Sequence, residues 1–242
     1  MKCCLFTFVL AAGACLSAAT LPSRSPVEPQ LAIYYSFDTA PPPTVVNEMQ
    51  AELGRILAPT DLRVTWRDLS AGANGGETFR EVVILRLRGN CALNPSNAQL
   101  QDGLAAAGNP LAETELAEGK VLSFGEVACD QLRKFIGPVA TVNDASQGSV
   151  VLGRAVARVA AHEIYHMLTG SGEHSKTGIF RAEHSRAELI EAKFDFARAD
   201  IEWLKQWADR PAGHQLVTTN DEPAPGSIAA IASDEEAVDS RR

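Results

Sequence analysis

Short apolar segments of the chain alternate with longer segments whose apolar residues are spaced three and four apart. The short segments contain many β-branched, aromatic and aliphatic residues, which is the pattern of β-strands. They span residues 31–37, 62–66, 82–87 and 121–127. The pattern therefore predicts four strands, the second of which alternates apolar and charged residues as a half-buried strand does.

Residues 44–57 have the periodicity of an amphipathic helix. Their apolar side chains recur at intervals of three and four and so fall on one helix face. Thr44, which follows three prolines, can cap this helix, and Pro59 ends it. The apolar positions are Val45, Met49, Leu53, Ile56 and Leu57.

Two further helices are predicted in the second half of the chain. The first runs from Ser149, a candidate N-cap, to Thr169, and glycines follow its end, where a left-handed residue is needed. The second begins with Ser185 as its cap and continues to about Asp209, where Pro211 stops it.

Residues 1–19 have the pattern of a cleaved secretory signal peptide. Lys2 precedes an uncharged apolar run, and Ser17-Ala18-Ala19 supplies small residues at a cleavage site. The run is too short for a comfortable transmembrane helix. We therefore expect a mature chain without a membrane span, exported to the periplasm or the extracellular space. An uncleaved anchor and a lipid-anchored form at Cys15 are the alternatives.

The rest of the chain divides into three parts. Residues 20–30, rich in Pro and Ser, read as a linker. Residues 31–210 contain all the predicted strands and helices and form one domain. Residues 211–242 are rich in Ala, Pro, Asp and Glu and have no apolar periodicity, which is typical of a disordered acidic tail.

Composition and charge exclude some classes of protein. The 242 residues are 45% hydrophobic and 21% charged, an ordinary globular composition. The formal net charge of −8 argues against nucleic-acid binding, because a nucleic-acid binder needs a basic surface to replace phosphate counterions. The charge does not select a substrate, so the candidate chemistry depends on particular residues.

The cysteines predict one disulfide. Cleavage after residue 19 would leave only Cys91 and Cys129 in the mature chain, in an oxidising setting where two cysteines most economically pair. The pair would tie together the ends of a loose segment, residues 92–119, whose composition predicts no element. Two separate buried thiols are the alternative. Neither cysteine lies in a C-x-x-C motif, which disfavours a redox centre or a cysteine-based zinc site.

The stretch His162-Glu163-Ile164-Tyr165-His166 carries the candidate chemistry. Its two histidines are one helical turn apart, so their side chains project from one helix face and can bind the same zinc ion. Glu163, next to the first histidine, can take a proton from a water that the metal activates. The chain has only five histidines, and this helix is otherwise apolar. Two unrelated surface histidines are the alternative.

A catalytic zinc needs a third protein ligand and an open position for water. His174 is the best candidate, because Gly170 and Gly172 allow the chain to turn back after the helix. The alternative for His174 is an exposed loop histidine with no ligand role.

The segment from His162 to Ser175 resembles the zinc site of the metzincins, with its motif helix, glycine turn and third histidine. Seven residues separate His166 from His174, where the usual metzincin pattern has five. Phe180 stands where metzincins place the methionine of their Met-turn. His184 stands where a group of poorly characterised bacterial metzincin-like proteins often has tryptophan.

The resemblance covers residues 152–189 and, more faintly, 124–129. It implies an α/β (α+β) zincin fold, in which a small mixed sheet packs on the active-site helix and a long C-terminal helix.

A gluzincin site is the competing interpretation of the third ligand. In that family the ligand is a glutamate on a later helix, and Glu188 and Glu191 lie one turn apart on the helix that begins near Ser185. Their charged neighbours favour an ordinary solvated face instead. His184 could also approach the metal, although a surface histidine at a helix start is the simpler interpretation. His214 lies in the predicted tail and is assigned no role.

The sequence therefore predicts hydrolysis of peptide bonds in a peptide or protein substrate. One catalytic zinc ion would be bound by His162, His166 and His174, with Glu163 as general base. The rival class is a non-catalytic, zinc-stabilised binding protein of the envelope. Glu163 argues against it, because a structural metal site has no need of a base.

Overall fold

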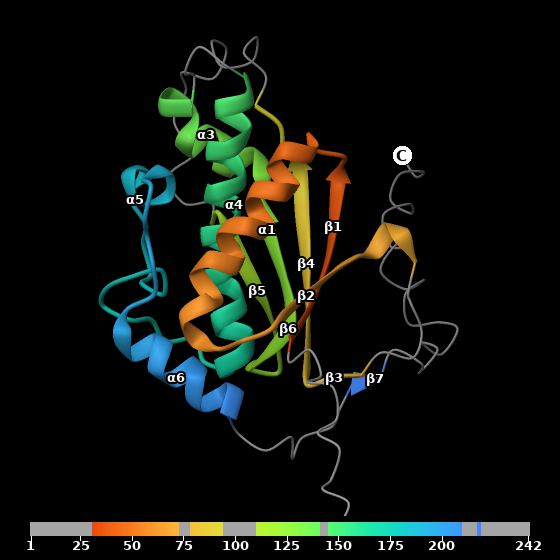
Figure 1. Cartoon of the computed structure of the whole chain (residues 1–242), viewed down its shortest axis with the longest axis vertical. Helices are drawn as coiled ribbons and strands as arrows, with labels where there is room; N and C mark the ends of the chain where they lie inside the picture. Colours follow the sequence, from red (N-terminus) through yellow and green to blue (C-terminus); the bar gives the residue numbers. More distant parts are fainter. Residues whose placement is uncertain (1–30, 73–77, 94–109, 141–144, 210–216, 219–242) are drawn as a thin grey trace, which may run out of the picture.

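A mixed sheet of five strands forms the centre of the structure, a computed structural model that describes residues 31–72, 78–93, 110–140, 145–209 and 217–218 (Figure 1). The strand order is β2-β1-β4-β6-β5, and all neighbours are parallel except β5, which runs antiparallel to β6 at one edge. The strands are β2 (Val64–Asp68), β1 (Leu31–Thr39), β4 (Glu81–Asn90), β6 (Lys120–Ala128) and β5 (Ala112–Ala117). The expected mixed α/β class is confirmed.

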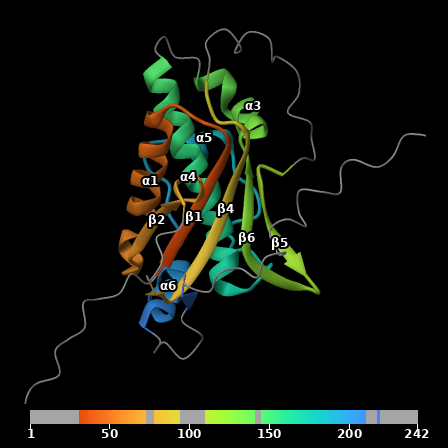
Figure 2. The same cartoon turned by 90° about the vertical axis from the view of Figure 1, so that its right-hand side faces the viewer.

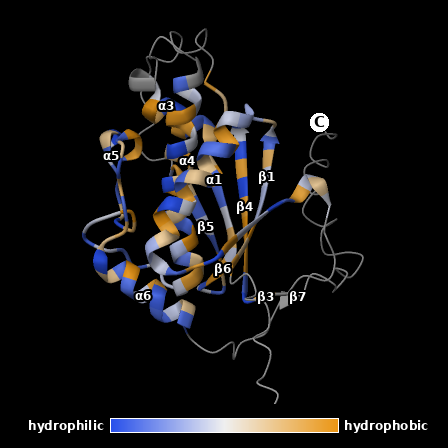
Figure 3. Cartoon of the chain, viewed as in Figure 1, coloured by the Kyte–Doolittle hydropathy of each residue, from blue (hydrophilic) through white to orange (hydrophobic). Residues whose placement is uncertain are grey.

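The four predicted strands are all present, and β5 is an additional one. It lies within the segment for which the composition predicted no element. As an edge strand, β5 exposes most of its side chains to solvent, so it lacks the apolar pattern by which the other strands were found. In β4, by contrast, buried apolar residues alternate with more exposed residues, and both apolar and polar positions can be seen along the strand in Figure 3.

Five helices are described: α1 (Pro43–Leu57), α3 (Cys129–Ala140), α4 (Ala145–Thr169), α5 (Arg186–Ile190) and α6 (Arg198–Asp209). Short 3-10 turns follow α1 at Ala58–Thr60 and β2 at Leu69–Ala71. A second, two-stranded sheet pairs β3 (Thr78–Phe79) with β7 (Val217–Thr218). The strand β7 falls in the segment predicted to be a disordered tail.

Two predicted helix caps are wrong. Thr44 lies inside α1, whose N-cap is Pro42 with Pro43 at the first helical position, where a missing N–H costs nothing. Ser149 is buried inside α4, which begins four residues earlier, at Ala145. In both cases the helix begins before the residue that was predicted to cap it.

The predicted helix from Ser185 to Asp209 is two helices. Ser185 does cap the first: its hydroxyl accepts from the Glu188 N–H, and the Glu188 carboxylate accepts from the Ser185 N–H. That helix ends after Ile190, and the backbone then extends so that the Asp195 carbonyl accepts from the Ile179 N–H at 3.0 Å. This long-range backbone bond takes precedence over the local helical pattern.

The helix α4 packs against α1 and against β6 and β5 of the sheet, at the centre of the main core (Figures 1 and 2). Gly153 allows the two helices to approach closely, because a Cβ there would lie 2.7 Å from the Val45 carbonyl oxygen. One turn before the histidine motif, the fully buried Arg158 pairs with Glu52 of α1 at 2.7 Å. It also donates to the Glu188 carbonyl at 2.7 Å, which ties α4 to both α1 and α5.

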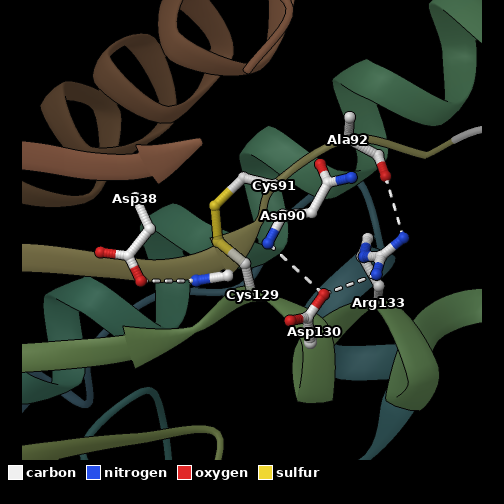
Figure 4. Close-up of a disulfide and its surroundings, with 8 residues drawn as sticks. Asp38, Asn90, Cys91, Ala92, Cys129, Asp130 and Arg133 are labelled. Carbon is white, nitrogen blue, oxygen red and sulfur yellow. Dashed lines mark hydrogen bonds and ion pairs between the residues drawn. A yellow bond between two sulfur atoms is a disulfide. The ribbon is translucent and has the colours of Figure 1, made fainter. Parts of the chain in front are cut away.

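The predicted disulfide between Cys91 and Cys129 is present, where it joins the end of β4 to the start of α3 (Figure 4). Asp130 accepts hydrogen bonds nearby from the Asn90 N–H at 3.4 Å and from Arg133 at 2.6 Å. Arg133 also donates to the Ala92 carbonyl at 3.2 Å. The crosslink therefore closes a chain segment whose two ends are also joined by hydrogen bonds.

Several predictions fall on residues outside those the structure describes. They are the signal peptide at residues 1–19, the linker at 20–30, and the acidic tail at 211–242, which includes His214, apart from residues 217–218. Within the described part of the chain, no helix is long and apolar enough to cross a membrane.

Candidate metal centre

The last third of α4 places the histidine motif in a buried position. His162, Glu163 and His166 are 7%, 6% and 8% exposed. The α-helical spacing puts the two imidazoles on one face, and their Nε2 atoms lie 3.1 Å apart. This confirms the predicted geometry of the motif within the helix.

His174 joins the two helical histidines. Its Nε2 lies 3.2 Å from the Nε2 of His166. The ligand atoms of all three histidines lie within 4.8 Å of one another. Roughly tetrahedral zinc with Zn–N bonds of about 2.0–2.1 Å needs nitrogens roughly 3.3 Å apart, so this donor set fits a zinc ion.

The opposite ring nitrogens of the helical histidines face backbone carbonyls. His162 Nδ1 is 2.9 Å from the Ile179 carbonyl oxygen, and His166 Nδ1 is 2.6 Å from that of Ser171. Since each Nδ1 donates there, the Nε2 lone pairs are left facing the shared centre. Burial lowers the pKa of His162 to about 3 and also lowers the pKa of His166, so both rings are neutral at pH 7, as metal ligands must be.

The chain turns back to His174 through Gly170, as the glycines after the helix predicted. Gly170 has a φ of +65° and donates to the His166 carbonyl at 2.8 Å, which ends the helix with a left-handed residue. Gly172 does not have a positive φ and lines the cleft beside the histidines. Only the first of the two glycines is therefore needed for its backbone conformation.

Phe180 forms an apolar floor beneath the histidines. It is 4% exposed, and its ring centroid lies 4.7 Å from that of His166, 5.3 Å from that of His162 and 3.9 Å from that of Tyr165. Its carbonyl accepts from the Ser175 N–H at 2.8 Å, which links the floor to the segment that carries His174. The position that resembled a Met-turn thus lies under the three imidazoles, with phenylalanine in place of methionine.

Glu163 points into the same cleft. Its carboxylate accepts a hydrogen bond from the Thr114 hydroxyl of β5 at 2.6 Å. Burial raises the pKa of Glu163 to about 7, and the bond from Thr114 acts in the opposite direction. A carboxyl group with its pKa near neutrality can both accept and release a proton, which is what a general base needs.

The cleft has a volume of about 540 Å³ and contains the candidate ligands and base. Residues 110–114, which lead into β5 and form its first half, make one wall, and residues 182–184 make another. Val159 and Phe135 contribute apolar surface to the same cleft. An extended peptide could therefore enter beside the histidines, with part of its surface against apolar side chains.

The alternative ligands are not members of the three-histidine cluster. Glu188 accepts from Ser185 in the cap of α5 and pairs with Arg181 at 2.7 Å. Glu191 is exposed after the end of α5. Neither is in the metal-compatible cluster found among the described residues. His184 lines the cleft, with Nε2 2.7 Å from the Ile179 carbonyl oxygen, but is not in that cluster either.

Sequence reasoning missed two residues that support the site. Thr114 lies on the unpredicted edge strand, and nothing in its local sequence indicates its role. Asp200 is 3% exposed and accepts from the Ser175 hydroxyl at 2.5 Å and from the Ala197 N–H at 3.2 Å. Burial, together with Asp200, raises the pKa of Tyr165 to about 12. A charged residue on the buried face of a predicted helix was the signal that could have identified Asp200.

Comparisons with known proteins give a weak structural likeness. No family model and no curated protein matches the sequence. The structure is similar to the crystal structure of archaemetzincin from Methanopyrus kandleri, with a TM-score of 0.46 and 12% sequence identity. The overlap covers 77% of this chain and 99% of that chain. At this level, the likeness assigns no residue and no activity to the chain.

Proposed function

We propose that this chain is a zinc-dependent metallopeptidase of the metzincin type. The observation that carries the proposal is the convergence of His162, His166 and His174 beside the buried Glu163 in one cleft. A zinc ion held by the three imidazoles would acidify a water molecule and polarise the carbonyl of the scissile peptide bond.

The chain's own residues would perform the proton transfers and exclude solvent. Glu163 would take a proton from the attacking water and deliver it to the nitrogen of the leaving amine. Phe180 would shield the histidines from below, and the β5 wall would hold the substrate backbone alongside Glu163. The imidazoles of His162 and His166, whose pKa values are lowered by burial, would offer their Nε2 lone pairs to the metal.

The rival function, a non-catalytic zinc-stabilised binding protein, has less support. Structural zinc sites tend to be filled by four protein ligands. Among the described residues, the metal-compatible group has only three members. The acidic residue next to it lies in the cleft with a pKa suited to proton transfer. These two features favour an open catalytic site.

The general base is tested by Glu163→Gln, with Glu191→Gln as a matched control on an exposed glutamate. Glu163→Gln should keep zinc and lose turnover on a peptide library by at least about 100-fold, since no ligand is removed but proton transfer is. The control should match the wild type in both measurements. Near wild-type turnover by Glu163→Gln would refute the mechanism.

The third ligand is tested by zinc competition against a chromogenic chelator. His174→Ala should lower zinc affinity and thermal stability together, because the site retains only two ligands. Glu188→Ala and Glu191→Ala should change zinc affinity little. The opposite ranking would move the protein to the gluzincin type.

We also propose that the protein is exported by its N-terminal segment. The Cys91–Cys129 disulfide supports this, because such crosslinks persist in oxidising compartments. N-terminal sequencing of protein recovered outside the cytoplasm should begin at Thr20. A product that begins at Met1, or a lipid-modified Cys15, would contradict the proposed cleavage.

A further inference from the structure

The Thr114 hydroxyl is aimed at one oxygen of the Glu163 carboxylate. Its Oγ1 donates to Oε2 at 2.6 Å, a distance typical of an O–H group bound to an ionised carboxylate. The two residues are 49 positions apart and lie on different elements, β5 and α4. Within the described part of the chain, Thr114 is the side chain seen to donate to this carboxylate.

The sheet is built to bring this hydroxyl close to the helix. Thr114 pairs with Gly125 of β6. A Cβ on Gly125 would lie 2.5 Å from Met167 Cε, 3.1 Å from the Glu113 carbonyl oxygen and 3.7 Å from Glu163 Cβ. The bare backbone at Gly125 therefore lets α4 lie directly over the Thr114–Gly125 pair. Immediately after Thr114 the register between β5 and β6 shifts, so the regular pairing ends at this residue.

A hydrogen bond to one carboxylate oxygen can fix the orientation of a general base. A glutamate side chain has three rotatable bonds, and a buried carboxylate without a partner is costly. With Oε2 held by Thr114, the carboxylate has one orientation, and Oε1 remains available to a water molecule in the cleft. The arrangement orients the base without occupying the oxygen that would accept the proton.

We propose that Thr114 is a positioning residue, which acts through Glu163 and holds its carboxylate ready for proton transfer. The inference rests on the proposed peptidase function. Thr114 is not among the proposed metal ligands, so zinc binding should not depend on its hydroxyl.

The test compares Thr114→Val, which removes the hydroxyl at nearly constant volume, with Thr114→Ser, which keeps it. Thr65→Val is the matched control, since Thr65 is a half-buried threonine on β2, at the opposite edge of the same sheet. On the zinc-loaded full chain, Thr114→Val should lower kcat on a peptide substrate by about 10-fold or more. KM and zinc content should stay within about 2-fold of the wild type, and Thr114→Ser should restore most of the kcat.

A second readout needs neither zinc nor activity. In zinc-free protein at pH 8, Thr114→Val should lower Tm by several degrees in the wild-type background, because Glu163 loses its partner. The same change should have little effect in a Glu163→Leu background, where no carboxylate is present.

The outcomes separate the two proposals. If Glu163→Gln is inactive while Thr114→Val keeps the wild-type kcat, the positioning role is overturned and the peptidase function stands. If Thr114→Val loses zinc, raises KM alone or is not rescued by serine, the residue has another role. Equal Tm shifts in both backgrounds would show that the hydroxyl does not act through Glu163. A wild type without zinc-dependent turnover overturns both.

Discussion

Replacement of Glu163 by glutamine should change how the stability of the zinc-free protein depends on pH. Glu163 is 6% exposed, and burial raises the pKa of its carboxyl group from the ordinary value of 4.5 to about 7. In the unfolded chain the group has its ordinary pKa. Between these two values the native state therefore keeps a proton that the unfolded state has lost.

The direction and the size of this change in stability with pH follow from the linkage between proton binding and folding. Where the native state binds more protons than the unfolded state, the free energy of unfolding falls as pH rises. Each pKa unit corresponds to about 1.36 kcal/mol, so a shift to about 7 predicts a loss of roughly 2 to 3 kcal/mol between about pH 5 and pH 8. Glutamine does not ionise, so Glu163→Gln should avoid this loss.

The neighbouring histidines act in the opposite direction but cancel in the comparison. Burial lowers the pKa of His162 to about 3, so its contribution to stability rises with pH up to the ordinary histidine pKa. The contribution of His166 has the same sign, because burial also lowers its pKa. Both histidines are present in the wild type and in the variant, so the difference between the two proteins isolates Glu163.

The assay is equilibrium unfolding in urea at pH 5 and pH 8, with a chelator present and the disulfide intact. Relative to the wild type, Glu163→Gln should gain roughly 2 to 3 kcal/mol on going from pH 5 to pH 8. Glu191→Gln, which replaces an exposed glutamate, should show no such gain. A difference between Glu163→Gln and wild type that is constant with pH would refute the buried, proton-binding state of this carboxyl group.

Three other changes test the fold. Serine at both Cys91 and Cys129 should lower the free energy of unfolding by about 4 kcal/mol, since the disulfide joins residues 38 positions apart, and thiol titration of the unfolded, unreduced wild type should find neither cysteine free. Gly153→Ala should cost about 1–3 kcal/mol in urea unfolding, because its Cβ would lie 2.7 Å from the Val45 carbonyl oxygen; wild-type stability would contradict the close helix crossing. Gly54→Ala, at an exposed position of α1 with nothing within 4 Å of the new Cβ, should instead stabilise by up to about 1 kcal/mol, and a loss of stability there would contradict the open surface.

Much of the secondary structure followed from local pattern, and the errors have identifiable causes. The core strands and α1 were predicted because burial of one face or both leaves a periodic apolar pattern. The edge strand β5 was missed because its side chains are largely exposed. The helix α3 (Cys129–Ala140) was not predicted either, and the structure offers no physical reason for that omission. The helix expected from Ser185 to Asp209 is interrupted because the Asp195 carbonyl is bonded to the distant Ile179 N–H.

The sequence by itself determined the part of the candidate site that one helix can define. The spacing of His162 and His166, and the place of Glu163 beside them, are consequences of 3.6 residues per turn and needed no knowledge of the rest of the chain. The sequence also narrowed the third ligand to a short list, because histidines are few and a glycine turn follows the helix.

Only the tertiary structure decided which distant groups complete the site. It brought His174 to the helical histidines, placed Phe180 beneath them and aimed the Thr114 hydroxyl at Glu163. These contacts join a turn, a loop and an edge strand to α4 and leave no periodic trace along the chain. Their geometry depends on how the sheet and the helices pack together, and for that reason local spacing could suggest the chemistry but not the surroundings that support it.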